Sequence, residues 1–430
     1  MIEITAELQN GSRKSSTVEE ACAVSLRCFY TTGDSRKCGF DWFRIGDNGD
    51  IPFKECVGYY WDKGHKISDP YIYDKALFKP DKDLQNTLQG NYKVLKDVFW
   101  RNGYKGEKMP YIVPILSIGE GEHISLDIKR DGKQSSDIFV ESDLEDSSVY
   151  DYPKTIAPNQ DSFAITCLKM QDKISLLKFF SDESKEEQCG ELVIIPKSLV
   201  FCKSVEIVFC KVYIVDSGRN LNTVFGNYRL QLLNKNSLTS LVDCFSQALV
   251  DIQYNKTSCL ELEVWEDDMQ PFYVKLKDKN AFDIEKSNEL IALLRKREKE
   301  KYFSVKKDCI KVYIMPDIPF INKYGKETRA FSVIGQNTIF CKNGVDGMTL
   351  VHEVGHALGL PHTFVYRSVL ANSLNNKSNN SEMSFCYEKK KTDNFMDYSN
   401  YRMFFYYWQW KVMNEKLRRR SLKVPCFRVK

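Results

Sequence analysis

The sequence predicts a multidomain α+β protein in three parts. Residues 1–108 are expected to form a small α+β module, residues 109–204 a β-sandwich of immunoglobulin-like type, and residues 205–430 an α/β domain. Three observations support this division. The 430 residues exceed what one hydrophobic core usually serves. The composition, 43% hydrophobic and 28% charged, is that of a globular protein. Finally, closely spaced short strands give way near residue 205 to alternating strand and helix patterns.

Charge and hydropathy exclude two classes of partner. The 62 basic residues nearly balance 58 acidic ones, so no chain-wide field favours nucleic acid, and we expect no nucleic-acid partner. No apolar run approaches the roughly 18 residues that a membrane span requires. The first seven residues include acidic side chains and no apolar stretch, which argues against a secretory signal peptide. We therefore expect a protein that is cytoplasmic as synthesised, with export by a signal-peptide-independent route left open.

The fourteen cysteines lie at irregular intervals and form no Cys-x-x-Cys pair. Buried free thiols in a reducing compartment are the favoured interpretation, with a disulfide framework as the alternative.

The module at residues 1–108 shows turn-rich stretches, many aromatic residues and one expected helix over residues 84–99. Its role is not indicated by any motif. The sandwich is expected from short apolar runs separated by turns, with the acidic stretch 141–151 as a solvated loop. Its expected strands cover residues 111–117, 123–128, 137–140, 163–170, 174–180 and 191–195.

In the third part, strand and helix signals alternate. Strands are expected at residues 205–215, 260–265, 310–315, 330–334 and 338–341, and helices at residues 237–253, 283–303 and from 346 onward.

The last of these helices carries the pattern His-Glu-x-x-His-x-x-Gly-x-x-His. His352 and His356 are four residues apart, so a helix presents both imidazoles on one face to a single metal ion. Gly359 can adopt the left-handed conformation that ends the helix, which lets His362 reach the same ion. Three neutral imidazoles with one open position are typical of a catalytic Zn²⁺ site. Since the chain has only five histidines, a chance match is the weaker interpretation.

Glu353 follows the first histidine by one helical step, beside the metal but not among its ligands. A bound zinc ion lowers the pKa of a water toward about 7. A carboxylate here can take the proton as that water attacks a carbonyl carbon, and can deliver it to the leaving amine. Glu353 is therefore the expected general base.

Downstream, the run Asn394-Phe395-Met396-Asp397-Tyr398 joins the zinc motif. Together they resemble the metzincin clan of zinc peptidases, and most closely its pappalysin-like family, over residues 205–430. The resemblance implies that Met396 forms the methionine turn beneath the histidines and that Tyr398 stabilises the reaction intermediate. It also implies that an edge strand at residues 330–341 binds extended substrates.

Some features depart from that family. An insertion rich in Asn, Ser and Lys covers residues 371–391, and no cysteine follows the methionine turn closely. The basic run 416–420 is expected to be a solvated helix end. Residues 36–41, around Cys38, are similar to a cysteine-switch segment, but an ordinary thiol is the favoured interpretation, so Cys38→Ser should leave activity unchanged.

The function expected from these features is that of a zinc-dependent endopeptidase that acts on protein or peptide substrates. Its N-terminal modules would recognise a substrate, a target protein or a secretion apparatus. Such a protein could be an intracellular enzyme or a leaderless effector; finding it only in the cytosol of producing cells would argue against the second. The alternative from another class is a catalytically silent binding or structural protein that zinc stabilises.

Overall fold

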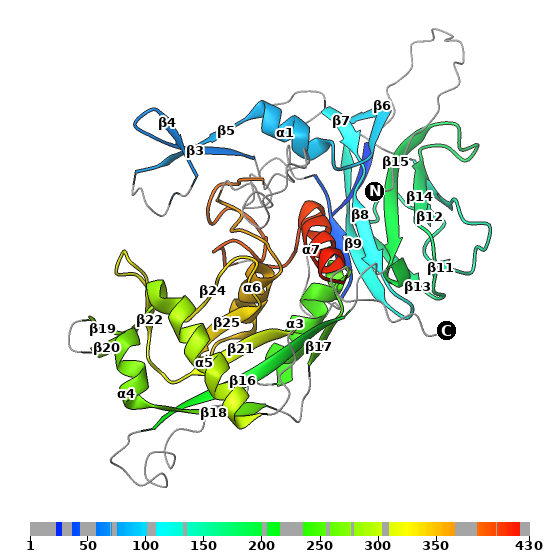
Figure 1. Ribbon diagram of the computed structural model, residues 1–430. Helices are drawn as coiled ribbons and strands as arrows, with labels where there is room; N and C mark the ends of the chain where they lie inside the picture. The colour runs from blue at the N-terminus through cyan, green and yellow to red at the C-terminus, as the bar shows by residue number, and fades with distance from the viewer. Residues whose placement is uncertain are drawn as a thin grey trace.

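The computed structural model describes most of the chain. The described residues are 23–27, 37–43, 57–68, 70, 75–100, 109–131, 136–199, 204–215, 235–254, 259–276, 279–302, 309–365, 385–400 and 402–421. Arg36 of the proposed switch segment and residues 371–384 of the predicted insertion lie outside them. Within these ranges the protein is a mixed α+β structure with several sheets (Figure 1). No helix of the described residues is long and apolar enough to cross a membrane.

Two sheets enclose one apolar core in the region predicted to be a β-sandwich. Inward-facing residues of both sheets, among them Leu126, Phe163 and Phe179, belong to one buried cluster. The predicted strands are present, except that the run expected as one strand at residues 111–117 forms two, β7 (Met109–Ile112) and β8 (Ile115–Ile118). The first sheet contains β1 (Ala23–Arg27), β9 (His123–Asp131), β13 (Ser162–Cys167) and β11 (Tyr150–Asp151) in that order. The second contains β12 (Thr155–Ile156), β10 (Ile138–Ser142), β14 (Ser175–Phe180), β15 (Gln188–Pro196), β8 (Ile115–Ile118) and β2 (Gly39–Asp41).

The region before residue 109 contributes to more than one part of the fold. β1 pairs with β9 and β2 pairs with β8, so two strands of the predicted N-terminal module belong to the sandwich sheets. A separate three-stranded sheet has the order β4 (His65–Ile67), β3 (Gly58–Asp62) and β5 (Leu77–Pro80). It is followed by α1 (Lys82–Gln89), β6 (Val94–Trp100) and β7 (Met109–Ile112).

The single helix predicted over residues 84–99 is wrong in its second half. Helix α1 stops at the C-cap Gly90, and the following residues form β6, which pairs with β7. Apolar residues in this stretch suit either a helix or a strand, and the pairing with β7 decides between them.

The third part is built on a sheet that is covered on both faces. Its strand order is β17 (Ile252–Tyr254), β16 (Val205–Val215), β21 (Ile310–Met315), β25 (Thr338–Lys342) and β24 (Ala330–Ser332), and β18 (Leu260–Trp265) also pairs with β16. All these pairs are parallel except that of β24 with β25. One face packs with α3 (Lys235–Gln247) and α6 (Gly347–Ala357), and the other with α5 (Ser287–Lys301). A parallel sheet requires this double cover.

The long helix α7 (Tyr407–Ser421) and several short elements are the remaining parts of the described structure. The short elements are η2 (Lys197–Leu199), α4 (Glu266–Met269), η3 (Gln270–Phe272), β19 (Tyr273–Leu276), β20 (Lys279–Asp283), η4 (Ile284–Lys286), β22 (Phe320–Ile321) and β23 (Glu327–Thr328).

Buried polar contacts join the sandwich to the third part. The Ser117 hydroxyl on β8 donates to the carbonyl of Gln247 at the end of α3, 2.6 Å away. The Asp41 carboxylate on β2 accepts from the backbone N–H of Tyr407, the first residue of α7, at 2.6 Å. A carboxylate at a helix N-terminus also interacts favourably with the helix dipole. Figure 1 shows α7 between the sandwich strands and α6.

Candidate metal centre

Helix α6 begins at a capping residue and is buried along its length. The Asp346 side chain accepts from the backbone N–H and from the hydroxyl of Thr349, at 2.8 and 2.7 Å. His352 and His356 lie on this helix and are 3% and 5% exposed. The four-residue spacing puts both rings on one face, and their centroids are 4.7 Å apart.

A glycine turn brings the third histidine to the same place. Gly359 has a φ of +100°, a conformation that favours glycine. The backbone N–H of Leu360 donates to the carbonyl of Gly355 at 3.0 Å, which closes the helix end. The chain then reverses, and the ring centroid of His362 lies 5.1 Å from that of His352 and 4.5 Å from that of His356.

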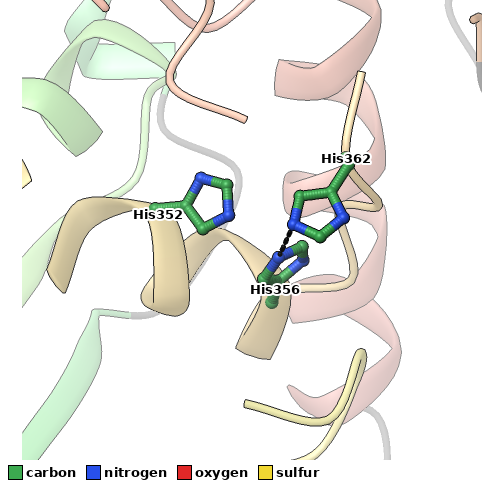
Figure 2. Close-up of side chains that lie close together, drawn as sticks. All are labelled: His352, His356 and His362. Carbon is green, nitrogen blue, oxygen red and sulfur yellow. Dashed lines mark hydrogen bonds between the residues drawn. The ribbon is translucent and has the colours of Figure 1, made fainter. Parts of the chain in front are cut away.

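The three rings converge on one point, as Figure 2 shows. One nitrogen of each histidine lies within 4.8 Å of the others, so the group can hold a metal ion. The Nε2 atoms of His356 and His362 are only 3.1 Å apart. The structure therefore brings together all three of the metal ligands predicted from the sequence.

The hydrogen bonds of two rings fix which nitrogen offers a lone pair. His352 Nδ1 lies 2.8 Å from the carbonyl of Phe395, and His356 Nδ1 lies 2.7 Å from the carbonyl of Leu360. A carbonyl oxygen only accepts, so each Nδ1 carries the proton and each Nε2 keeps its lone pair.

The chemistry of this donor set fits a cation. His352 Nε2 is buried and has no hydrogen-bond partner among the described residues. Burial, together with the neighbouring His356, holds the pKa of His352 well below its ordinary value, so its imidazole is neutral. A buried neutral imidazole with an unpaired nitrogen is suited to metal ligation.

Glu353 follows His352 on α6, and the edge strand holds its side chain. The Ser332 hydroxyl on β24 donates to Glu353 Oε2 at 2.9 Å and lies 3.0 Å from the Glu353 backbone carbonyl. Burial raises the pKa of Glu353 to about 8, against the opposing effect of the Ser332 hydrogen bond. Because a nearby cation favours the ionised form, a metal at the histidines would lower this pKa.

The predicted methionine turn lies directly against α6. Met396 is fully buried, and a Cβ on Gly355, between the two helical histidines, would lie 2.5 Å from its Sδ. The side-chain amides of Asn394 and Gln409 form reciprocal hydrogen bonds at 2.7 and 3.1 Å, and Asn394 Oδ1 accepts from the Met396 N–H. The turn is thus tied to α7.

Tyr398 reaches the centre from the same turn. Its hydroxyl lies 2.8 Å from His362 Nε2, and its ring stacks on His352 with centroids 5.4 Å apart. The side chain is 39% exposed, so the phenol stands at the accessible side of the histidine group. Of the other residues predicted for the site, Tyr398 lies against the histidines, Met396 packs on α6, Glu353 follows His352 on that helix, and Gly359 ends it.

The cysteine that was weighed as a switch lies elsewhere. Cys38 belongs to the buried core of the sandwich, and its thiol contacts the Glu122 carboxylate at 3.7 Å. Burial raises the pKa of the Cys38 thiol above its ordinary value. None of the nine cysteines that the structure describes forms a disulfide.

Two supporting residues were not recognised from the sequence. Ser332 carries no motif, and its hydrogen bond to Glu353 follows only from the packing of β24 against α6. Lys416 was expected to be solvated, but its ammonium donates to the Ala357 carbonyl at 2.7 Å. It thereby satisfies a carbonyl at the end of α6, where a cation is favoured.

Comparison with known proteins assigns the chain to no family. No protein-family model matches the chain, and no curated protein matches it. The structure defines a mixed α+β protein with a group of three histidines that can hold a metal ion.

Proposed function

We propose that the protein is a zinc-dependent endopeptidase of metzincin type, with the pappalysin-like family as the nearest resemblance. The observation that carries the proposal is the convergence of three histidine nitrogens, with a buried carboxylate on the residue that follows the first of them. Nitrogen ligands from three histidines with an open fourth position suit Zn²⁺ in a catalytic role. His352, His356 and His362 would hold the ion.

When bound, zinc supplies a Lewis acid that polarises a carbonyl group and activates a water. Glu353 would accept the proton of the attacking water and pass it to the leaving amine. The Ser332 hydroxyl keeps the carboxylate oriented for that task. His352 and His356 are fixed in the required tautomer by backbone carbonyls.

Tyr398 is proposed to assist from the exposed side of the centre. A phenol donates a hydrogen bond without carrying a charge, so it can stabilise negative charge that develops on a carbonyl oxygen. The 2.8 Å distance between its hydroxyl and His362 Nε2 supports this role.

The substrate is proposed to be an extended peptide. Strand β24 is the last strand of its sheet, antiparallel to β25, and an edge strand can bind a peptide by adding it as a further strand. Since Ser332 belongs to β24 and contacts Glu353, a peptide on this edge would lie beside the proposed base.

A direct test compares zinc-loaded wild type, Glu353→Ala and Glu327→Ala on a library of peptides. Glu327 is an exposed glutamate on β23 and serves as the matched control. We expect cleavage by wild type and Glu327→Ala, and a loss of at least about 100-fold in Glu353→Ala, the scale of general-base catalysis. Equal cleavage by all three proteins would refute the proposal. Zinc binding without cleavage of any peptide would instead favour the silent, zinc-stabilised protein.

A further inference from the structure

The small sheet before residue 81 contacts the chain segments that surround the third ligand. The backbone N–H of Gly58 donates to the carbonyl of Cys386 at 2.8 Å, and Val57 forms an antiparallel bridge with Tyr387. The N–H of Tyr387 in turn donates to the carbonyl of Thr363 at 2.7 Å. Thr363 directly follows His362, so backbone hydrogen bonds lead from β3 to the third ligand.

Side chains form a second connection between the same parts. The Tyr60 hydroxyl on β3 accepts from the Lys389 N–H at 2.6 Å, across 329 residues of sequence. Tyr60 and Phe364 belong to one buried apolar cluster and are 6% and 0% exposed. The Phe364 ring stacks on His362 at 10°, with centroids 4.9 Å apart. The orientation of the His362 ring therefore depends on a cluster that the N-terminal region helps to build.

We infer that Tyr60 is a positioning residue of the metal centre, through which the sheet β4–β3–β5 fixes Phe364 and, with it, the ring of His362. This assigns a role to a part of the chain whose sequence shows no motif. It rests on the proposed metal centre but not on peptidase activity. The sheet is on this account a wall of the centre, as opposed to a separate recognition module.

Removing the Tyr60 ring should weaken metal binding more than removing its hydroxyl alone. Tyr60→Ala removes a large buried ring from the apolar cluster that contains Phe364, so the ring stacked on His362 should lose support. Tyr60→Phe keeps the ring and removes only the acceptor for the Lys389 N–H. Groups that orient a metal ligand typically contribute about 10–100-fold to metal affinity. We expect Tyr60→Ala to lower the metal affinity by about 10-fold or more and Tyr60→Phe to lower it by less.

The test loads metal-free protein with Co²⁺ and records its visible spectrum and its affinity in competition with a chelator. Tyr150→Phe is the matched control, because Tyr150 is a 3%-exposed tyrosine of the sandwich whose hydroxyl accepts one hydrogen bond, from Ser175. The expected result is weaker binding and an altered spectrum in Tyr60→Ala, an intermediate result in Tyr60→Phe, and no change in Tyr150→Phe.

Phe364→Leu provides a second variant, since it removes the ring stacked on His362 but keeps an apolar side chain. It should weaken Co²⁺ binding even if Tyr60→Ala fails to fold. Wild-type affinity and spectrum in folded Tyr60→Phe and Phe364→Leu would overturn the inference. The two proposals can fail independently. If only the peptidase proposal fails, the wild type still binds Co²⁺ but cleaves no peptide. A wild type that binds no Co²⁺ would overturn both.

Discussion

At the scale of single residues, the buried carboxyl group of Glu353 destabilises the metal-free protein at neutral pH. Glu353 is 6% exposed, and burial raises its pKa to about 8 from an ordinary value of 4.5. The unfolded chain therefore releases this proton at a lower pH than the folded one. The free energy of unfolding falls as the pH rises from the ordinary value to the raised one.

Glu353→Gln should accordingly stabilise the metal-free protein at neutral pH. We expect a gain of roughly 2–3 kcal/mol at pH 7, because the neutral amide has no proton to lose. The gain should vanish below about pH 4, where the carboxyl group is protonated in both states. Urea unfolding of both proteins between pH 4 and 8 measures it, and a difference independent of pH would contradict the account.

Gly355 provides a second test at this scale. Its alanine variant would place a Cβ 2.5 Å from the buried Met396 sulfur, so the Met396 side chain must shift within a packed core. We expect a loss of about 1–3 kcal/mol of stability and weaker metal binding. Gly90→Ala is the control, since the nearest atom to its Cβ lies 3.4 Å away and its φ is −59°. Equal stability of the two variants in chemical unfolding would show that the turn does not press on α6.

At the scale of elements, periodicity predicted most of the third part correctly. The strand at Val205–Val215 and the helix at Gly347–Ala357 were expected from apolar spacing and from the metal motif. Spacing also predicted the ligands, because the geometry of one helix and one glycine turn is local. The stretch 84–99 was mispredicted since its structure depends on β7, a partner strand that a local pattern does not reveal.

The end of α6 depends on another element, α7. Lys416→Met removes the ammonium group that donates to the Ala357 carbonyl, but it keeps an apolar side chain of similar length. We expect a loss of about 1 kcal/mol, the usual contribution of such a hydrogen bond, and a parallel loss of metal affinity because His362 follows this helix end. Chemical unfolding and chelator competition measure the two effects. Lys326→Met, at an exposed lysine, is the control, and identical values for the two variants would exclude the capping role.

At the scale of the whole molecule, the sandwich and the third part share buried polar contacts. Asp41 is fully buried and accepts both from the Tyr407 N–H and from the Tyr92 hydroxyl, each at 2.6 Å. These residues are up to 366 positions apart. Contacts of such separation could not be inferred from the sequence, which is why the N-terminal residues were expected to form separate modules.

Asp41→Ala should destabilise the protein by about 2–4 kcal/mol, because it removes a fully buried carboxylate that accepts two hydrogen bonds. Asp41→Asn retains an acceptor oxygen and should lose less. The comparison is made by chemical unfolding followed through tryptophan fluorescence. If both variants unfold like the wild type, Asp41 does not join the two parts.

The central claim is that His352, His356 and His362 form a zinc centre. The most direct measurement is the zinc content per chain of purified wild type, His362→Ala and His65→Ala, the last being an exposed histidine on β4. The account predicts one zinc ion per chain in wild type and in His65→Ala, and loss of that ion in His362→Ala. Folded wild type without zinc, or equal zinc in all three proteins, would contradict it.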